Sequence, residues 1–338
     1  MPSPTVTVAV PTLAADGALA ECLCALERQT FTDFEVVVVD NSGSRRVQAS
    51  YPRIRVISNA TNVGFGAAVN QAFRSSQSKY AAALNDDAVA APTWLEALVD
   101  CAEANRKTGM FASRVCFSDP RWKNAALDSA GMLIAADGSS KQRGHGQPAQ
   151  AFDNSSEALF PSGSAAMYRR EMLQQAGMFD ESFFLYCEDT DLGLRGRWAG
   201  WDCRYVPDAV VEHRYSHSSG VASVLKAYYV ERNRLYTVIK NFPLGALIRA
   251  MFAEPARYFW HVASIFEGRG KAAEFRRNGK SALWLPWLVL RAHAAALLQL
   301  PRLLKQRRQI MSARHISSRE FQRILARHSI SLRRVAAL

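Results

Sequence analysis

Apolar residues in the first 90 positions follow two alternating periods. Apolar or β-branched runs, each typical of a strand, occupy residues 5–12, 34–44, 53–59 and 80–84. Apolar residues recur at helical spacing within 16–30, and again from about Gly66 to Ser76. Strands that are apolar throughout and alternate with helices are typical of a mainly parallel sheet covered by helices on both faces. The pattern therefore predicts an α/β fold.

Polar side chains follow the last apolar residue of each predicted strand. They are Thr12, Asp40 with Asn41 and Ser42, Asn59, and Asn85, Asp86 and Asp87. Because ligands bind beyond the carboxyl ends of the strands in such a sheet, we expect these side chains to lie along one edge. Asn and Asp are also frequent turn residues, which is the simpler interpretation of an isolated Asn-Asp-Asp. Several carboxylates on one edge favour a site instead, and hard divalent cations prefer carboxylate oxygens.

The glycine-containing loop 59–72 bears on a dinucleotide-binding interpretation. Its GFGAAV fits the start of a G-x-G-x-x-G motif, but Val69 stands at the third glycine position. The glycines also come several residues after the strand instead of in its first turn, which argues against a Rossmann dehydrogenase. Glycines at a helix N-terminus still allow backbone N–H groups to approach an anionic ligand closely.

A second acidic cluster follows a run of aromatic and apolar residues. Glu188, Asp189 and Asp191 open a predicted helix, and Asp191 can pair with Arg195 at i, i+4. A carboxylate in an apolar setting also suits a general base, because desolvation raises its pKa toward the working pH. Both interpretations are open, and the ion pair explains Asp191 better than Asp189.

The middle of the chain has a weaker pattern. Residues 119–157 are rich in Gly, Ser, Asp and Gln, which predicts long loops and short strands near the site. A turn or strand and then a helix ending at Gly177 follow. A later strand ends on Glu212 and His213. A single histidine is more often structural, but its position after an apolar strand makes His213 a candidate metal ligand.

Charge divides the 338-residue chain into two parts. Residues 1–239 carry 23 Lys and Arg against 26 Asp and Glu, whereas residues 240–338 carry 19 against 4. The net charges of −3 and +15 predict two functional regions, an α/β domain over 1–239 and a basic C-terminal region over 240–338.

Cysteine spacing and the N-terminus indicate the compartment. The six cysteines include no C-x-x-C pair, so we expect reduced, packed thiols. The first residues have no basic segment before their short apolar run, so we expect a strand there, no signal peptide and a cytoplasmic location.

Two segments of the C-terminal region combine Trp, Phe and Leu with basic residues. A transmembrane span needs about 20 predominantly apolar residues. Arg249, Glu254 and Arg257 interrupt the first segment, and Arg291 and His293 interrupt the second. We therefore expect amphipathic helices that lie on an anionic membrane surface. The alternative is an ordinary helical packing region or a homo-oligomer interface with a solvated basic face.

Seven motifs occur in a fixed order along the chain. They are VAVPT, QTFTDFEVVVVDNSGS, NVGFGAAVNQA, LNDD, PSGSAAMYRR, GMFDESFFLYCEDTDLGLR and VEHRYSHS. Together they resemble the family 2 glycosyltransferases, particularly the bacterial rhamnosyltransferase-like branch of cell-surface polysaccharide synthesis. The resemblance covers roughly residues 5–240. It implies a GT-A (nucleotide-diphospho-sugar transferase) fold with a C-terminal helical extension, and inverting sugar transfer that depends on Mg²⁺ or Mn²⁺.

The resemblance also implies roles for individual residues. The positions that match nucleotide or donor contacts are Thr12, Asp40, Asn62, Gly64, Gly66, Asn70 and Asp86. Asn85 to Asp87 match the family's D-x-D with Asn85 in place of the first Asp, so Asp87 is left as the metal ligand. His213 matches an additional metal or phosphate contact, and Asp189 matches the catalytic base. Supporting positions are Asn85, Glu188, Asp191 and Arg195.

The donor and acceptor are expectations from the branch that the chain resembles. They are rhamnose from dTDP-rhamnose and a hydroxyl of a lipid-linked or polysaccharide acceptor in cell wall or O-antigen synthesis. A galactofuranosyl- or other hexosyltransferase, or a sugar nucleotidyltransferase, are the alternatives. A nucleotidyltransferase would give no role to the segment CEDTDLGLR, which counts against that alternative. Nucleic-acid binding would need stacking aromatics interleaved with the basic residues, whereas the aromatics of the tail lie in apolar helices, so we expect no nucleic-acid partner.

Overall fold

The strands of the computed structural model account for most of its N-terminal half. The structure describes residues 3–13, 17–47, 53–118, 126–213, 224–270, 273–274 and 284–338. The strands are β1 (Val6–Thr12), β2 (Phe34–Asp40), β3 (Ile54–Ser58), β4 (Tyr80–Leu84), β5 (Ala88–Ala90), β6 (Thr108–Phe117), β7 (Leu127–Ser129), β8 (Met132–Ile134), β9 (Ser140–Gln142), β10 (Ser156–Glu157), β11 (Ala165–Arg169) and β12 (Asp202–His213).

Helices alternate with the first strands and then form the whole C-terminal region of the described chain. They are α1 (Ala18–Glu27), α2 (Phe65–Arg74), α3 (Trp94–Ala104), α4 (Arg170–Ala176), α5 (Glu188–Trp198), α6 (Val224–Asn241), α7 (Leu244–Phe266), α9 (Trp284–Leu298), α10 (Leu300–Ser312), α11 (Ser318–Arg327) and α12 (Leu332–Ala337). Two short 3₁₀ turns span Ala149–Phe152 and Glu181–Phe183. The expected helix ending at Gly177 is confirmed by α4, which Gly177 follows with a φ of 80°.

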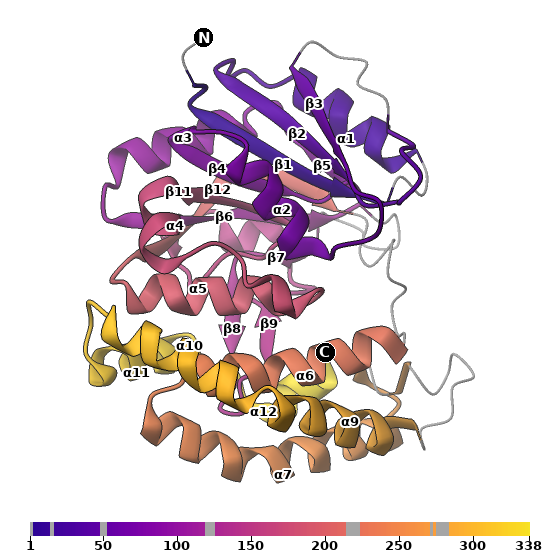
Figure 1. Cartoon of the computed structure of the whole chain (residues 1–338), viewed down its shortest axis with the longest axis vertical. Coiled ribbons are helices and arrows are strands. Elements are labelled where there is room, and N and C mark those ends of the chain that lie inside the picture. The colour runs from indigo at the N-terminus through magenta and orange to yellow at the C-terminus, as the bar shows by residue number, and fades with distance from the viewer. Residues whose placement is uncertain are drawn as a thin grey trace.

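One ten-stranded sheet occupies the upper half of the molecule in Figure 1. Its main path runs β10-β12-β6-β11-β4-β1-β2-β3, with β5 on β12 and β7 on β6. β1 pairs in parallel with both β2 and β4, whereas β11 runs antiparallel between β4 and β6. The predicted α/β fold with a mainly parallel sheet is therefore confirmed. β8 and β9 form a separate hairpin that extends toward the lower helices.

The register of the sheet confirms the predicted edge. Thr12 at the end of β1 pairs with Asp40 at the end of β2, and Asp40 pairs with Ser58 at the end of β3. β4 runs beside β1 in the same direction and ends at Leu84, so Asn85, the first residue beyond it, leaves at the same edge. The polar residues that follow these strands therefore lie on one side of the sheet.

Two apolar clusters lie on the two faces of the sheet. Side chains of α1 and α3 form one cluster with the sheet. The other contains residues of α2, α4 and α5 and continues into α6, α7 and α11, with Phe242 and Phe321 among its buried members. The sheet and the helices of the C-terminal region therefore share one core, and the division predicted at 239/240 falls inside α6. Separate functions for the two regions remain a prediction.

A buried lysine joins α6 to α5 and to the loop before it. Nζ of Lys240 lies 2.7 Å from Oδ2 of Asp180 and 2.8 Å from Oδ1 of Asp191, and its side chain is 2% exposed. Burial opposes ionisation of the two carboxyls, but the ammonium group, together with Ser182 at Asp180 and Arg195 at Asp191, outweighs burial and holds the pKa of both below its usual range. Without these two carboxylates Lys240 would be an uncompensated buried charge.

Lys240→Met should destabilise the protein strongly. Removal of Lys240 takes a shared cation from two poorly solvated carboxylates, of which Asp191 keeps a close guanidinium, that of Arg195 at 2.9 Å. Breaking a buried pair in this way costs up to about 3–5 kcal/mol. Urea denaturation followed by circular dichroism measures this loss, and Lys305→Met, at an exposed lysine of α10, is the control. A free energy of unfolding within about 1 kcal/mol of wild type for Lys240→Met, the range of a surface pair, would contradict this assignment.

Because the pKa values of Asp180 and Asp191 are lowered in the folded protein, the stabilisation by Lys240 is present above the unfolded pKa of an aspartate, about 3.9, and is lost as the pH falls below it. The difference in stability between wild type and Lys240→Met should therefore shrink in acid.

Candidate active site

The end of β4 places three consecutive polar residues at the predicted edge. Oγ1 of Thr12 donates a hydrogen bond of 2.6 Å to Oδ2 of Asp86, which joins the ends of β1 and β4. The next carboxylate, Asp87, is buried. The backbone N–H of Asn85 donates to the carbonyl of Ser164 at 2.9 Å. Thr12, Asn85, Asp86 and Asp87 thus lie together, as the sequence predicts.

His213 lies against this group from the end of β12. Its Nε2 is 3.2 Å from Oδ1 of Asp87 and 3.2 Å from the side-chain nitrogen of Asn85. Its Nδ1 is 3.2 Å from Oδ2 of Asp128. Burial disfavours the charged imidazole, but the hydrogen bonds and charges of Asp128 and Asp87 outweigh it and raise the pKa of His213 to about 10. A carboxylate on one ring nitrogen that leaves the other facing a possible ligand site is typical of metal-binding histidines.

Asp128 is a site residue that the sequence pattern did not identify. It is buried, and its second oxygen, Oδ1, lies 3.1 Å from Nδ1 of His145. Despite burial, the hydrogen bonds from His145 and His213 hold the pKa of Asp128 below its usual range. Both Asp128 and His145 come from the 119–157 stretch, where only loops and short strands near the site were predicted. The last residues of the VEHRYSHS motif, 214–218, lie outside the described residues.

The PSGS segment connects the end of β4 with the second acidic cluster. The carbonyl of Ser164 accepts from Asn85, and the N–H of the preceding Gly163 donates to Oδ2 of Asp189 at 3.0 Å. A Cβ at Gly163 would lie 3.5 Å from that same carboxylate. One short backbone segment therefore contacts both Asn85, which begins the Asn-Asp-Asp sequence, and the carboxylate of Asp189.

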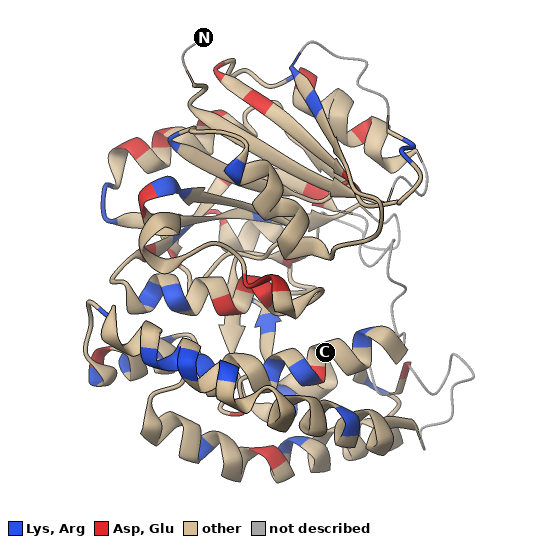
Figure 2. Ribbon diagram, viewed as in Figure 1, with Lys and Arg blue, Asp and Glu red and all other residues tan. Residues whose placement is uncertain are grey.

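Glu188 and Asp189 form a pair of carboxyls in the first turn of α5, which Figure 2 shows in red. Burial raises the pKa of Glu188 to about 8, and the adjacent charge of Asp189 adds to this effect. Burial also raises the pKa of Asp189, although its hydrogen bonds from Gly163 and Thr190 oppose the rise. Oε2 of Glu188 is buried and accepts no hydrogen bond within the described residues. A pair of carboxyls with raised pKa values is the setting that a general base requires.

The N-terminus of α2 lies directly against the loop that precedes α5. Oδ1 of Asn62 accepts a hydrogen bond of 2.9 Å from the N–H of Gly64, which has a φ of 89°. A Cβ at Gly64 would lie 2.4 Å from the carbonyl oxygen of Phe184, so only glycine fits. The next residue, Phe65, donates its N–H to that carbonyl at 2.8 Å. A Cβ at Gly66 would be 3.7 Å from Glu188. Asn62, Gly64 and Gly66 therefore lie near the acidic pair.

Asn70 and Asp40 use their polar atoms within the protein. The buried amide of Asn70 donates to the carbonyl of Phe179 at 2.9 Å and accepts from the N–H of Phe179 at 3.1 Å. Asp40 accepts from the N–H groups of Ser42 and Val47 at 2.8 and 3.1 Å. Burial opposes ionisation of Asp40, but these bonds hold its pKa below the usual range. Asn70 thus joins α2 to the loop before α5, and Asp40 orders the loop after β2.

Asp191 and Arg195 have the structural role that their spacing indicates. Nε of Arg195 donates to Oδ2 of Asp191 at 2.9 Å, which confirms the predicted i, i+4 pair. The same guanidinium donates to the carbonyls of Ala176, Gly177 and Met178. Asp191 also accepts from the amide of Asn241 at 2.8 Å. These contacts join α5 to α4 and α6.

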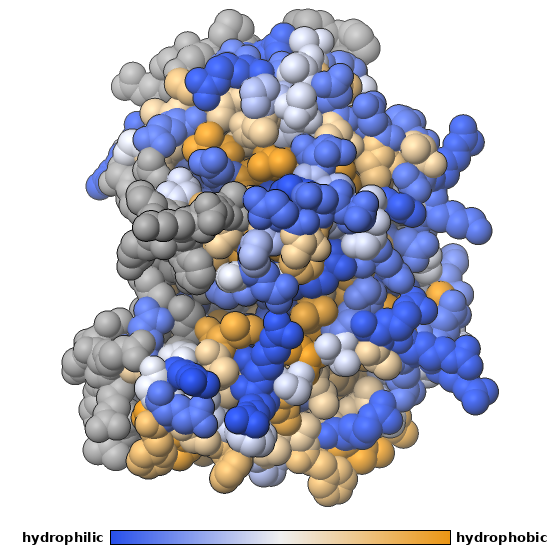
Figure 3. Space-filling view, turned by 180° about the vertical axis from the view of Figure 1, so that it is seen from behind, coloured by the Kyte–Doolittle hydropathy of each residue, from blue (hydrophilic) through white to orange (hydrophobic). Residues whose placement is uncertain are grey.

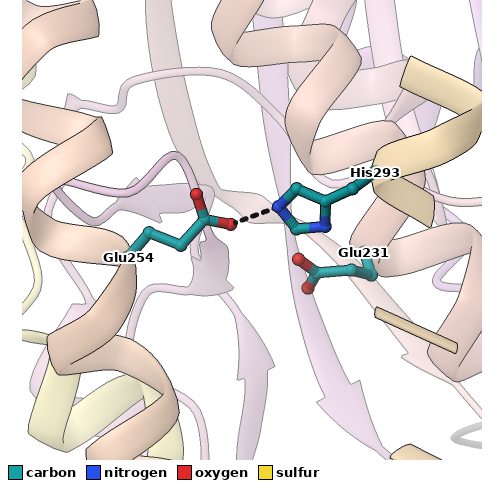
Figure 4. A group of neighbouring side chains, drawn as sticks. All are labelled: Glu231, Glu254 and His293. Atoms are coloured by element: carbon teal, nitrogen blue, oxygen red, sulfur yellow. Dashed lines mark hydrogen bonds and ion pairs between the residues drawn. The ribbon is translucent and has the colours of Figure 1, made fainter. Parts of the chain in front are cut away.

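A third acidic cluster lies among the C-terminal helices, at Glu231, Glu254 and His293 (Figure 4). Its ligand atoms lie close enough to hold a cation. Two guanidinium groups already occupy the carboxylates, because Arg234 lies 2.6 Å from both and Arg257 lies 2.7 Å from Glu231. A divalent cation would have to displace or face two arginines. We therefore assign this cluster to a buried ion-pair network between α6, α7 and α9.

The family is established by comparison with known sequences. The model of "Glycosyl transferase family 2" matches residues 7–177, a little over half of the chain. The chain belongs to this family. The N-acetylglucosaminyl-diphospho-decaprenol L-rhamnosyltransferase of Mycobacterium tuberculosis is 28% identical over 238 residues, which cover 62% of this chain and 77% of that protein. The resemblance to a rhamnosyltransferase-like branch of family 2 is confirmed.

Solved structures confirm the GT-A fold. GalNAc-T7, crystallised with UDP, GalNAc and Mn²⁺, superposes with a TM-score of 0.58 at 13% identity over 84% of this chain. This chain spans 56% of the GalNAc-T7 chain. Residues 1–349 of TarS from S. aureus, in complex with UDP, give a TM-score of 0.55 at 15% identity over 95% of this chain and 90% of that one.

Proposed function

We propose that the protein is a metal-dependent inverting glycosyltransferase that moves a sugar from a nucleotide diphosphate sugar to an acceptor hydroxyl. The observation that carries this proposal is that the Gly163–Ser164 segment binds both the start of Asn85–Asp87, through the N–H of Asn85, and the carboxylate of Asp189. A transferase of this class needs one group that binds the diphosphate of the donor and a second group that takes the proton from the acceptor hydroxyl. The membership of the chain in family 2 supports the proposal.

Asp87 and His213 have the chemistry of a divalent metal site. Oδ1 of Asp87 is buried and lies 3.2 Å from Nε2 of His213. A carboxylate oxygen beside an imidazole that a second carboxylate, Asp128, orients is a donor set that fits a divalent cation. Mg²⁺ or Mn²⁺ bound there would neutralise the charge that develops on the leaving diphosphate. Asp86, held by Thr12, would contact the donor beside it.

Asp189 would act as the base. Its carboxylate is held by Gly163 and Thr190, and burial raises its pKa above that of a solvated aspartate. It would take the proton from the acceptor hydroxyl while the hydroxyl oxygen attacks the anomeric carbon. A single displacement of this kind inverts the anomeric configuration. Glu188 would lie beside Asp189 as the second carboxyl of this buried pair, and it would not itself accept the proton.

The donor contacts would come from the sheet edge and from α2. Asp40 and Thr12 would face the nucleobase, and the Asn62 to Asn70 segment would lie along the nucleotide and the sugar. The relative from M. tuberculosis is a rhamnosyltransferase that acts on a diphospho-decaprenol. We therefore propose rhamnose from dTDP-rhamnose and a lipid-linked acceptor of cell-surface polysaccharide, with galactofuranose or another hexose as the alternative.

A panel of nucleotide sugars tests the class and the donor together. Purified protein with Mn²⁺ and each candidate donor should release nucleotide diphosphate from one donor in preference to the others, and this donor should raise the melting temperature. Release of pyrophosphate from an NTP and a sugar phosphate would point to a nucleotidyltransferase instead.

An exposed apolar surface on α7 and α9 supports the proposal that the protein works on a membrane. No described helix is long and apolar enough to cross a membrane. Large apolar side chains nevertheless face solvent along both helices, at Leu244, Ile248, Met251, Phe252, Phe259, Val262, Phe266, Trp284, Trp287, Leu290, Leu297 and Leu298. Phe252 is 80% and Phe266 84% exposed. Figure 3 shows hydrophobic residues along the lower edge of the molecule, where α7 lies in Figure 1.

Basic residues accompany this surface. Arg249, Arg269, Arg291 and Lys305 are exposed on or beside the same helices. Each basic residue near an anionic lipid surface contributes about 1 kcal/mol. We propose that α7 and α9 lie on the cytoplasmic face of the membrane, where a lipid-linked acceptor would be present. A homo-oligomer that covers the same surface is the alternative.

Asp87→Ala should reduce transfer by more than about 100-fold, because several kcal/mol of charge stabilisation at the diphosphate is lost with the metal. EDTA should have the same effect on wild type, and excess Mn²⁺ should restore wild type alone. Asp100→Ala, at an exposed carboxylate of α3, is the control and should keep its activity. Wild-type activity that is unchanged in EDTA would rule out the metal site.

Asp189→Asn should lower the turnover number about 10²–10⁴-fold while donor binding persists, because the amide cannot accept the proton. In wild type, turnover should fall as the pH drops through the raised pKa of the Glu188–Asp189 pair, well above the value of about 3.9 for a solvated aspartate. Initial rates between pH 5 and 9 measure both effects. Near-normal turnover of Asp189→Asn, with loss in Glu188→Gln or Asp191→Asn, would show that another carboxylate is the base.

Co-sedimentation with anionic liposomes tests the membrane surface. The full chain should pellet at low salt and be released at high salt. Phe252→Glu should bind about 30-fold more weakly, since an apolar contact of about 2 kcal/mol is lost. Ala104→Glu, at an exposed position of α3, is the matched control. Full-length variants are needed because α7 and α11 share the core of the sheet. If wild type stays in the supernatant at low salt, or Phe252→Glu pellets as well as wild type, the membrane proposal fails.

A further inference from the structure

The backbone immediately before Asp189 has an unusual conformation. Phe184, Tyr186 and Cys187 have φ values of 64°, 68° and 63°. Non-glycine residues rarely adopt positive φ, and such a conformation persists only where the surrounding structure fixes it. Three of the four residues that lead into α5 therefore need external support.

Asn233 of α6 supplies that support. Its side chain is fully buried, and its amide nitrogen lies 2.7–2.9 Å from three carbonyl oxygens, those of Phe183, Leu185 and Tyr186. An amide group has two N–H donors, so the three carbonyls share them. Oδ1 of Asn233 accepts from Nε of Arg232 at 2.9 Å, which fixes the orientation of the amide.

Arg232, the residue before Asn233, binds the start of the same loop. Its Nη2 donates to the carbonyls of Ser182 and Phe183 at 3.0 and 2.8 Å. Its guanidinium lies over the ring of Tyr229, 4.6 Å from the centroid, and that ring stacks on Phe184 at 5.3 Å. Hydrogen bonds and stacking from α6 therefore fix the backbone from Ser182 to Tyr186.

We propose that Asn233 is a positioning residue for catalysis, which fixes the 182–187 loop so that α5 begins at Glu188 and Asp189 faces the Gly163–Ser164 segment. This inference rests on the proposed role of Asp189. It assigns a function to α6, a helix that contributes neither Asp87 nor Asp189. A helix of the C-terminal layer would thus set the geometry of the base, and a misplacement of about 1 Å at such a group can cost about 100-fold in rate.

Two substitutions at Asn233 separate positioning by hydrogen-bond donation from simple packing. Asn233→Asp keeps the shape of the side chain but presents a carboxylate to three carbonyl oxygens, whereas Asn233→Ala removes the group. Gln29→Ala is the matched control, since the buried Gln29 amide also donates to two backbone carbonyls, those of Ala25 and Ala91, away from this loop.

The readouts are steady-state transfer, donor affinity by calorimetry, melting temperature, and hydrogen exchange of peptides that cover 182–189. Both Asn233 variants should lose about 10–100-fold in kcat, with Asn233→Asp at least as impaired as Asn233→Ala, and donor affinity should stay within about twofold. Exchange should accelerate in 182–189 in these variants and not in Gln29→Ala. If neither variant folds, Arg232→Met, which removes the bonds to Ser182 and Phe183, gives the same test.

Unchanged exchange in 182–189, or a kcat of Asn233→Asp within about twofold of wild type, would overturn the proposal. An Asn233→Asp that is fully active beside an impaired Asn233→Ala would also overturn it, because shape alone would then suffice. The exchange measurement needs no substrate. A wild-type protein that transfers no sugar would count against the proposed function, while exchange would still decide whether Asn233 fixes the loop.

Discussion

The site depends on the fixation of one irregular loop, residues 180–187, between two parts of the molecule. From above, α2 approaches so closely that the carbonyl of Phe184 accepts from Phe65 and leaves no room for a side chain at Gly64. From below, Asn233 donates to three carbonyls of the loop, and Lys240 neutralises Asp180 at its start. Because α5 begins where this loop ends, the position of Asp189 is determined by contacts with both the sheet domain and the C-terminal helices.

This arrangement gives the two halves of the site different supports. The donor end rests on the sheet, where register alone aligns Thr12 with Asp40, and Thr12 in turn holds Asp86. The acceptor end rests on α6, which is continuous with the helical layer that carries the exposed apolar surface. If α7 and α9 lie on a membrane, the helices that contact lipid pack against α6, the helix that would position the base. Chemistry and location would then be linked through one helix, and the shared core of the two regions is consistent with such a link.

Much of this could be predicted from the sequence because its signals are local. Apolar runs and their polar ends locate β1 to β4 and the edge on which Thr12, Asp40 and Asp87 lie. The i, i+4 spacing predicts the pair of Asp191 and Arg195. The buried residues of α3, Trp94, Leu95, Leu98, Val99 and Ala102, follow a helical spacing that could have located this helix. β6 is buried along nearly its whole length, so it shows no alternation of apolar and polar residues.

Contacts between distant residues could not be predicted in the same way. Asp128 is 85 positions from His213, and no spacing relates a carboxylate in a loop-like stretch to a histidine at the end of a later strand. Lys240 and Asn233 look like ordinary polar residues of an amphipathic helix, and only packing buries them against the loop. The positive φ values at Phe184, Tyr186 and Cys187 have no sequence signal, since none of these residues is glycine. Lys240, Asn233 and the backbone of 184–187 join the C-terminal helices to the sheet domain. The sequence therefore predicts the individual strands and polar residues of the site better than the contacts that bring them together.

The anomeric configuration of the product tests the central claim most directly. NMR of the glycoside formed from an active nucleotide sugar reports whether the sugar was transferred in one displacement assisted by the Asp189 base. The account predicts inversion relative to the donor, together with release of one nucleoside diphosphate for each glycosidic bond formed. Retention of configuration, or product formation without release of nucleoside diphosphate, would contradict it.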